Sequence, residues 1–214
     1  MGKQFDLIII GAGPGGYVAA KKAAKLGMSV VIIDKGDVGG TCINRGCIPT
    51  KALVHAAMLY REMTECEKFG LSAEKVGFDL QKIYEYKDLS AARMREELEK
   101  EFKELGVVSV RGTATIQSDK KVRVVTPNKE EEYYYGKHIL IATGARARTI
   151  DIPGLDLPGV MTSEELLTSN ESQYRRLLIL GGGVIGIELA TVLDRKSDGS
   201  GPGVNTGGSR IIKQ

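Results

Sequence analysis

The chain of 214 residues is 42% hydrophobic and 27% charged, as is usual for a globular protein with a buried core. Its net charge of +3 is too small to indicate nucleic acid as a partner. The sequence has no apolar run of the roughly 18 residues that span a membrane, and its N-terminus is not a signal peptide. We therefore expect a cytoplasmic protein with no nucleic-acid or membrane partner, whose three cysteines do not form a structural disulfide framework.

The order of apolar and polar residues predicts an α/β fold. Buried strands are predicted over 4–10 and 29–33, with an Ala-rich helix between them that ends at Gly27. Further helices are predicted from near Cys42 or Pro49 to Glu65, over 88–105 with Met94 and Leu98 on its apolar side, and over 163–171 with Ser163 as its cap. Short strands are expected within 106–141, and a last strand over 176–181 precedes another helix. The opening strand–helix–strand unit is typical of a parallel sheet.

The turn after the first strand has the glycine spacing of a dinucleotide-binding loop. Glycines at 11, 13 and 16 permit a tight turn, the approach of a pyrophosphate to the backbone, and close packing of helix on strand. A carboxylate at the end of the next strand is suited to bind a ribose. A glycine-rich turn without a ligand is the alternative. The residues expected to contact the cofactor here are Gly11, Gly13, Pro14, Gly15, Gly16, Asp34 and Lys35.

Two cysteines lie close together in the run GGTCINRGCIPTK, at positions 42 and 47. A zinc site would need a second pair of ligands, which Cys66 and the two histidines do not supply, so we expect no metal. A redox-active pair is favoured, because a helix N-terminus stabilises the reactive thiolate. Residues at i and i+5 lie on different faces of an ideal helix, so a bridge requires a distorted first turn, for which Gly46 supplies backbone freedom. Two inert thiols are the alternative.

The same run closely resembles the redox motif of the pyridine nucleotide–disulfide oxidoreductases, and its wording is most similar to the dihydrolipoamide dehydrogenase type. The resemblance covers about 1–193 and implies a Rossmann-like FAD-binding domain with a parallel sheet and a small antiparallel meander. It implies that Cys42 exchanges with the substrate disulfide, that Cys47 lies against the flavin, and that Lys51 lies beside flavin N5. Further FAD contacts that it implies are Gly40, Thr41, Ala114, Thr143 and Gly144.

A second glycine cluster, at 181–186, begins a second nucleotide-binding unit in the family. Gly181, Gly183 and Gly186 would contact NAD, which the final glycine weakly favours over NADP. Glu188 matches the glutamate that pairs with the flavin-side lysine, here Lys51, although a surface carboxylate is the alternative. We expect a FAD-binding domain over 1–150, the start of an NAD-binding domain over 151–193, and a disordered Gly/Ser-rich tail over 194–214.

The resemblance also implies a reaction and partners. In the complete enzyme, dihydrolipoamide is oxidised to lipoamide, and electrons pass through a Cys42–Cys47 disulfide and FAD to NAD. Its partners are the lipoyl groups of 2-oxo acid dehydrogenase or glycine cleavage complexes and a second copy of itself. The second nucleotide unit lacks its next strand and acid, so we expect a truncated form without full turnover. A non-catalytic isoform that binds FAD or partner subunits, and a reductase of the glutathione or mercuric type, are the alternatives.

Overall fold

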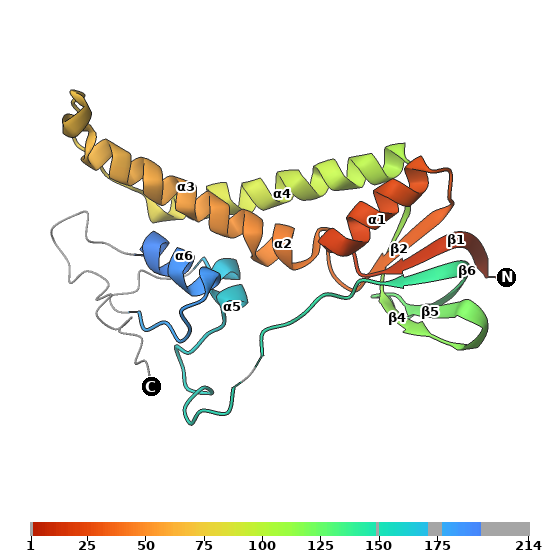
Figure 1. The fold of residues 1–214 in the computed structure, drawn as a ribbon. Coiled ribbons are helices and arrows are strands. Elements are labelled where there is room, and N and C mark those ends of the chain that lie inside the picture. The colour runs from red at the N-terminus through yellow and green to blue at the C-terminus, as the bar shows by residue number, and fades with distance from the viewer. Residues whose placement is uncertain (1, 149, 171–176, 194–214) are drawn as a thin grey trace. The chain divides into compact units, whose positions relative to one another are not determined.

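A computed structural model describes residues 2–148, 150–170 and 177–193, which belong to two compact units (Figure 1). Unit 1 comprises residues 1–47 and 91–150, and unit 2 comprises residues 48–90 and 151–214. The predicted domain boundary after residue 150 is therefore one of three positions at which the chain passes from one unit to the other. The predicted disordered tail, 194–214, lies outside the described residues.

Unit 1 is built on one sheet of six strands in the order β3-β2-β1-β6-β5-β4. β1 is paired in parallel with β2 and β6, and β2 with β3, whereas β4, β5 and β6 form an antiparallel meander. This confirms the predicted parallel sheet with a small meander. The strands are β1 (Lys3–Ile10), β2 (Val30–Asp34), β3 (Val108–Arg111), β4 (Thr113–Ile116), β5 (Lys121–Val125) and β6 (Glu131–Ile141).

The long strand β6 joins the parallel strands to the meander. Its Tyr134 is paired with Lys3 of β1 on one side and with Val122 of β5 on the other. Just beyond, a Cβ atom added to Gly136 would lie 2.8 Å from Cγ1 of Ile8 and 2.9 Å from the carbonyl oxygen of His138, so a larger residue there would force the surrounding atoms to shift. The meander packs over one face of the parallel strands. The fully buried residues between them are Ile8, Val31, Ile33, Val122, Val124 and Tyr134.

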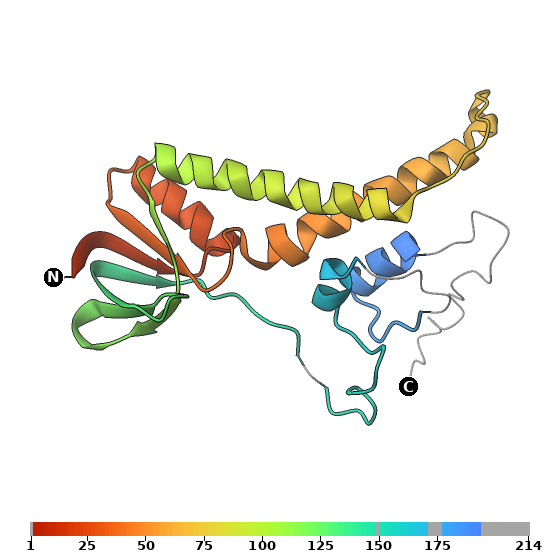
Figure 2. The same cartoon turned by 180° about the vertical axis from the view of Figure 1, so that it is seen from behind.

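Helices cover the other face of the parallel strands. Figures 1 and 2 show α1 (Pro14–Lys25) on the side opposite to β4 and β5, with the unit 1 part of α4 (Leu80–Glu104) beside it. Nζ of Lys21 lies 2.6 Å from a carboxylate oxygen of Glu101 and joins the two helices. Leu98 and Phe102 are buried, but Met94 is 39% exposed. The predicted apolar side was therefore wrong at Met94, because the buried face of α4 passes through Ala91, Leu98 and Phe102.

Unit 2 is helical around a small apolar core. Its elements are α3 (Cys47–Thr64), the start of α4, α5 (Ser163–Thr168), α6 (Val184–Leu193) and a 3-10 turn, η1 (Cys66–Phe69). The core packs Leu53, Tyr84, Leu167 and Leu189 together, one residue from each α-helix. Nζ of Lys87, which is 1% exposed, donates to the Leu167 carbonyl at 2.7 Å and to Oδ1 of Asn170 at 2.8 Å. This lysine therefore supplies a hydrogen-bond donor to a carbonyl at the C-terminal end of α5 and fixes α5 on α4.

Two sequence predictions in unit 2 were wrong. The cap of α5 is Thr162 rather than Ser163, because Thr162 and Glu165 form a reciprocal capping box. The strand predicted over 176–181 does not form in its described part, 177–181. A strand needs a neighbour for its backbone groups, and none of the strands in the described ranges pairs with this segment. None of the described helices is long and apolar enough to cross a membrane.

The carboxylate of Asp6 joins three chain segments at the start of β1. It accepts hydrogen bonds from the backbone N and Oγ of Ser29, both at 2.8 Å, and lies 2.7 Å from Nζ of Lys137. The Lys137 ammonium, followed by the Ser29 donors, holds the pKa of the Asp6 carboxyl well below its usual range. The ionised carboxylate therefore stabilises the folded state.

We expect Asp6→Asn to lower the melting temperature at pH 7 and to have a smaller effect in acid. The stabilisation by a carboxylate with a lowered pKa is fully present above its unfolded pKa of about 3.9 and is lost progressively as the pH falls from there towards the lower folded pKa. Melting temperatures from pH 7 to pH 3 measure the difference. Glu99→Gln, at an exposed position of α4, is the control and should show little difference at any pH. A constant difference for Asp6→Asn would contradict the assignment.

Gly16 lets α1 approach β1 closely. An added Cβ would lie 1.8 Å from the carbonyl oxygen of Gly11 and 3.3 Å from Cγ2 of Ile9, whereas at Gly15 the nearest atom is Cβ of Ala142 at 3.8 Å. We expect Gly16→Ala to lower the free energy of unfolding by roughly 1–3 kcal/mol, as overpacking does, and Gly15→Ala to change it little. Urea denaturation measures both, and equal midpoints would show that the packing is not tight.

Candidate functional site

Three strands of unit 1 end together at the predicted nucleotide-binding loop. The loop at 11–16 follows β1, which is flanked by β2 and β6. The backbone N of Gly11 donates to Ile33 at 2.7 Å, and that of Ala142 donates to Ile10 at 2.7 Å, so the ends of all three strands are tied. In α/β sheets, ligands bind outside the carboxyl ends of strands where the connections diverge to either side. The loop lies at such a position.

The N-terminus of α1 is suited to hold a phosphate. Its N-cap is Gly13, its first residue is Pro14, its first turn has no acidic residue, and none of the described side chains caps it. The partial positive charge of the helix end therefore remains available to an anion. An added Cβ at Gly13 would meet only Cα of Gly40, at 3.8 Å. Space and charge at this turn thus fit the pyrophosphate of a dinucleotide.

Asp34, at the end of β2, binds the backbone of the loop. Its Oδ2 accepts from the backbone N of Ala12 at 2.7 Å, and its Oδ1 accepts from that of Gly36 at 2.9 Å. A carboxylate oxygen accepts more than one hydrogen bond, so both oxygens can still accept hydrogen bonds from the hydroxyls of a ribose. Lys35 is exposed beside it. The carboxylate therefore shapes the loop and fits its predicted role in ribose binding.

The loop that leads to the cysteines crosses directly over the turn at 11–16, which we call the cradle because it is suited to a phosphate. The backbone N of Gly39 donates to the Ala12 carbonyl at 2.8 Å. Gly40 has a φ of +59°, and an added Cβ there would lie 2.6 Å from Cα of Gly13. Any other residue at this crossing would separate the two loops. Gly40 and Thr41 therefore begin the helix α2 (Gly40–Arg45) against the cradle.

The two cysteines of the run lie on successive helices rather than on one. α2 ends at Arg45, the next residue, Gly46, breaks the helix with a φ of −144° and a ψ of −104°, and α3 begins at Cys47. The spacing predicted such a distortion. Cys42 is half-buried and Cys47 is exposed, and the structure gives both as thiols. Their pairing as a disulfide remains a prediction.

The other residues predicted to form the site lie on α3, on α6, in the meander and after β6. Lys51 is exposed on α3, one turn after Cys47, and Glu188 is exposed on α6. Among the contacts of the described residues no hydrogen bond or ion pair joins them, so their pairing stays a prediction. Ala114 packs on the core beneath the meander, whereas Thr143 and Gly144 are exposed after β6.

The second glycine turn repeats the local geometry of the first. An added Cβ at Gly186 would lie 2.3 Å from the carbonyl oxygen of Gly181. The same close approach joins Gly16 to Gly11 in the first turn. Gly183 has open space around it, with no described atom within 4 Å of an added Cβ. The turn geometry thus forms at 181–186 although 177–180 is not in a strand.

Sequence reasoning missed two polar residues that hold the cysteine loop, Asn44 and Arg95. The amide nitrogen of Asn44 lies within hydrogen-bond distance of the carbonyl oxygens of Asp37, Val38 and Gly40, and its oxygen accepts from Arg95 of α4. An uncharged polar residue between two cysteines was the available signal for Asn44. Nothing local in the sequence points to Arg95.

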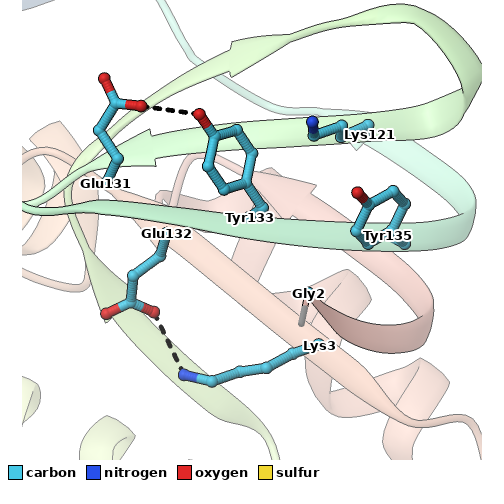
Figure 3. Close-up of a pocket in the computed structure, with 7 residues that line it drawn as sticks. All are labelled: Gly2, Lys3, Lys121, Glu131, Glu132, Tyr133 and Tyr135. Carbon is cyan, nitrogen blue, oxygen red and sulfur yellow. Dashed lines mark hydrogen bonds and ion pairs between the residues drawn. The ribbon is translucent and has the colours of Figure 1, made fainter.

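A shallow hollow of about 460 Å³ lies elsewhere in unit 1 (Figure 3). Its acidic groups are paired, Glu132 with Lys3 and Glu131 with the hydroxyl of Tyr133. It adjoins Lys3 at the amino end of β1, so the strand separates it from the loop at 11–16. In the described part of the chain, no cluster of His, Cys, Asp or Glu is suited to a metal ion. The residues lining the hollow are Gly2, Lys3, Lys121, Glu131, Glu132, Tyr133 and Tyr135.

Curated proteins of similar sequence are named dihydrolipoyl dehydrogenase. The protein of Zymomonas mobilis is 38% identical over 191 residues, which cover 89% of this chain and 41% of the relative. The mitochondrial protein of Dictyostelium discoideum is 38% identical over 195 residues, covering 90% and 40%. The protein of Acholeplasma laidlawii is 40% identical over 200 residues, covering 91% and 57%. The chain thus spans about 40% of the length of the first two relatives.

A solved structure has the same fold. The Cu(II) complex of the HOCl-induced flavoprotein disulfide reductase RclA from Escherichia coli matches with a TM-score of 0.75 and 32% identity, covering 90% of this chain and 40% of that one. This likeness to a flavoprotein confirms the predicted Rossmann-like α/β fold. A sequence profile described as pyridine nucleotide-disulphide oxidoreductase matches residues 5–199. The chain therefore belongs to the pyridine nucleotide–disulphide oxidoreductase family.

Proposed function

We propose that this chain binds FAD in the cradle of unit 1 and that Cys42 and Cys47 form the redox-active pair of a dihydrolipoamide-oxidising enzyme. The observation that carries the proposal is the crossing of Gly40 over Gly13, which brings the cysteine loop to the turn suited to a pyrophosphate. A nucleotide loop and a reactive thiol pair then belong to one site. FAD supplies this site with a two-electron acceptor.

Different residues of the chain would bind different parts of FAD. The helix end at Gly13 and Pro14 would hold the pyrophosphate, and Asp34 would accept from the ribose. Gly40 and Thr41 would approach the cofactor from the cysteine loop, and Thr143 and Gly144 from the end of β6. Gly11, Gly15, Gly16, Lys35 and Ala114 complete the proposed set of FAD-site residues.

The cysteine pair would perform thiol–disulfide exchange with the substrate. A dithiol that attacks a Cys42–Cys47 disulfide leaves as a disulfide, having lost two electrons and two protons, and both cysteines become thiols. Cys42 is proposed to exchange with the substrate and Cys47, which is exposed, to face the cofactor. Lys51, one turn along α3, would place a cation near the same position.

The later steps are proposed for the complete type of enzyme. NAD would accept the electrons at a site that begins with Gly181, Gly183 and Gly186, and Glu188 would pair with Lys51. Lipoyl groups of 2-oxo acid dehydrogenase or glycine cleavage complexes and a homodimeric partner belong to this proposal, which the names of the relatives support. By function, we assign 1–150 to FAD binding and 151–193 to the start of NAD binding.

A disulfide reductase with another substrate is the second candidate. Its support is the similarity to the RclA structure, described as an HOCl-induced flavoprotein disulfide reductase. The identity of 38% to dihydrolipoyl dehydrogenases, against 32% to RclA, favours the first. Rates with reduced lipoamide and with other thiols would separate the two.

We expect Gly13→Ala to abolish or strongly weaken FAD binding without changing stability. The methyl group fits the protein, with its nearest atom 3.8 Å away, but it occupies the space proposed for the pyrophosphate. A loss of affinity of on the order of tenfold or more, at least about 1.4 kcal/mol, follows. Fluorescence titration with FAD measures the affinity, and urea denaturation measures the stability.

Gly77→Ala is the matched control, because no described atom lies within 4 Å of an added Cβ at Gly77. It should bind FAD like the unchanged chain. If Gly13→Ala also binds FAD with unchanged affinity, the pyrophosphate does not lie on this turn and the proposed site is wrong.

A further inference from the structure

The side-chain amide of Asn44 lies close to three backbone carbonyl oxygens of the segment that leads to the cysteines. Its Nδ2 lies 2.9 Å from the carbonyl oxygen of Gly40, 3.0 Å from that of Val38 and 3.4 Å from that of Asp37. Asn44 itself lies on α2, between the two cysteines. One side chain thus fastens this helix to the loop that crosses the cradle.

Arg95 fixes the orientation of this amide. Its Nη1 donates to Oδ1 of Asn44 at 2.9 Å from the part of α4 that belongs to unit 1. Because the guanidinium is only a donor, it requires the amide oxygen on its side and leaves Nδ2 for the carbonyls. A hydrogen bond with a charged partner is stronger than a neutral one. Through Arg95, α4 therefore holds the amide in the orientation in which Nδ2 faces the carbonyl oxygens.

The position of Cys42 depends on this arrangement. Cys42 lies on the single short helix α2, which has six residues and little stability of its own. Gly46 follows as a flexible joint before Cys47. If α2 is not fastened to the loop, the two thiols sample more separations, and the effective concentration of one toward the other falls. A disulfide between them then becomes less stable.

We infer that Asn44, oriented by Arg95, is a positioning residue that sets the thiol–disulfide equilibrium of Cys42 and Cys47. This inference rests on the proposed function, in which these two cysteines form the redox pair. It assigns to a residue between the cysteines the task of holding them within bonding reach. Arg95 acts only through Asn44.

The test is the reduction potential of the 214-residue chain, equilibrated without FAD in glutathione redox buffers. Glutathione disulfide takes two electrons and two protons from the cysteine pair and becomes two thiols. We expect Arg95→Met to weaken disulfide formation by about tenfold, which raises the potential by about 30 mV for a two-electron couple. Asn44→Ala should have at least the same effect. An unchanged potential in both variants would overturn the inference.

The sign of the change separates positioning from a direct effect of charge. If Arg95 acted as a cation on the thiolates, its removal would disfavour the reduced state and lower the potential. A double-mutant cycle gives a second criterion, because Arg95→Met should have little further effect when Asn44 is already Ala. A lowered potential, or full additivity of the two changes, would overturn the role of Arg95 through Asn44.

Matched controls separate positioning from a general loss of stability. Arg93→Met removes an arginine from the same helix at an exposed position that has no hydrogen bond or ion pair to any described residue. Lys87→Met should destabilise unit 2, where Lys87 is buried. Neither should change the potential. If Arg95→Met does not fold, Arg95→Lys compared with Arg93→Lys carries the same test, with a smaller rise expected only at position 95.

The outcomes also separate this inference from the proposed function. An unchanged chain that forms no Cys42–Cys47 disulfide in oxidising buffer would contradict the redox pair itself. A disulfide that forms with the same potential in all variants would contradict only the positioning role. Because FAD is absent throughout, a failure to bind the cofactor affects neither reading.

Discussion

The close approach of two backbone loops at Gly13 and Gly40 is the constraint on which the candidate site depends. An added Cβ at Gly40 would lie 2.6 Å from Cα of Gly13, and its φ of +59° also disfavours other residues. The hydrogen bond from Gly39 to Ala12 fixes the crossing. As a result, the sequence that carries the cysteines begins its helix on the cradle itself. The proposed phosphate site and the two cysteines thereby share one region of unit 1.

The rest of unit 1 keeps the two loops in place. The meander and the parallel strands bury a common core around Tyr134 and Ile8. The hydrogen bond from the backbone N of Ala142 to the Ile10 carbonyl holds the ends of β1 and β6 together. Asp34 ties the turn after β1 to the end of β2 through Ala12 and Gly36. On the helical side, Arg95 of α4 reaches the cysteine loop through Asn44. The site is therefore supported from both faces of the sheet.

Sequence reasoning succeeded where the determinants are local. The spacing of Gly11, Gly13 and Gly16 and the β-branched strands around them predicted the first unit of the fold, and the separation of the cysteines predicted the break at Gly46. It failed where the structure depends on contacts between segments that are distant in the sequence. The segment 177–180 has a strand pattern but no neighbour among the described strands. Arg95 is 51 positions from Asn44, so no local pattern links the two residues.

If the cradle and the cysteine pair form one site, the Cys47 thiolate will change the absorption spectrum of bound FAD. The measurement is an anaerobic titration of the FAD-loaded chain with a dithiol. We expect a long-wavelength charge-transfer band to appear in the unchanged chain and in Cys66→Ser. Cys42→Ser should show the band without any dithiol, and Cys47→Ser should never show it. A chain that retains no flavin, or a spectrum that is the same in the Cys42 and Cys47 variants, would contradict a shared site.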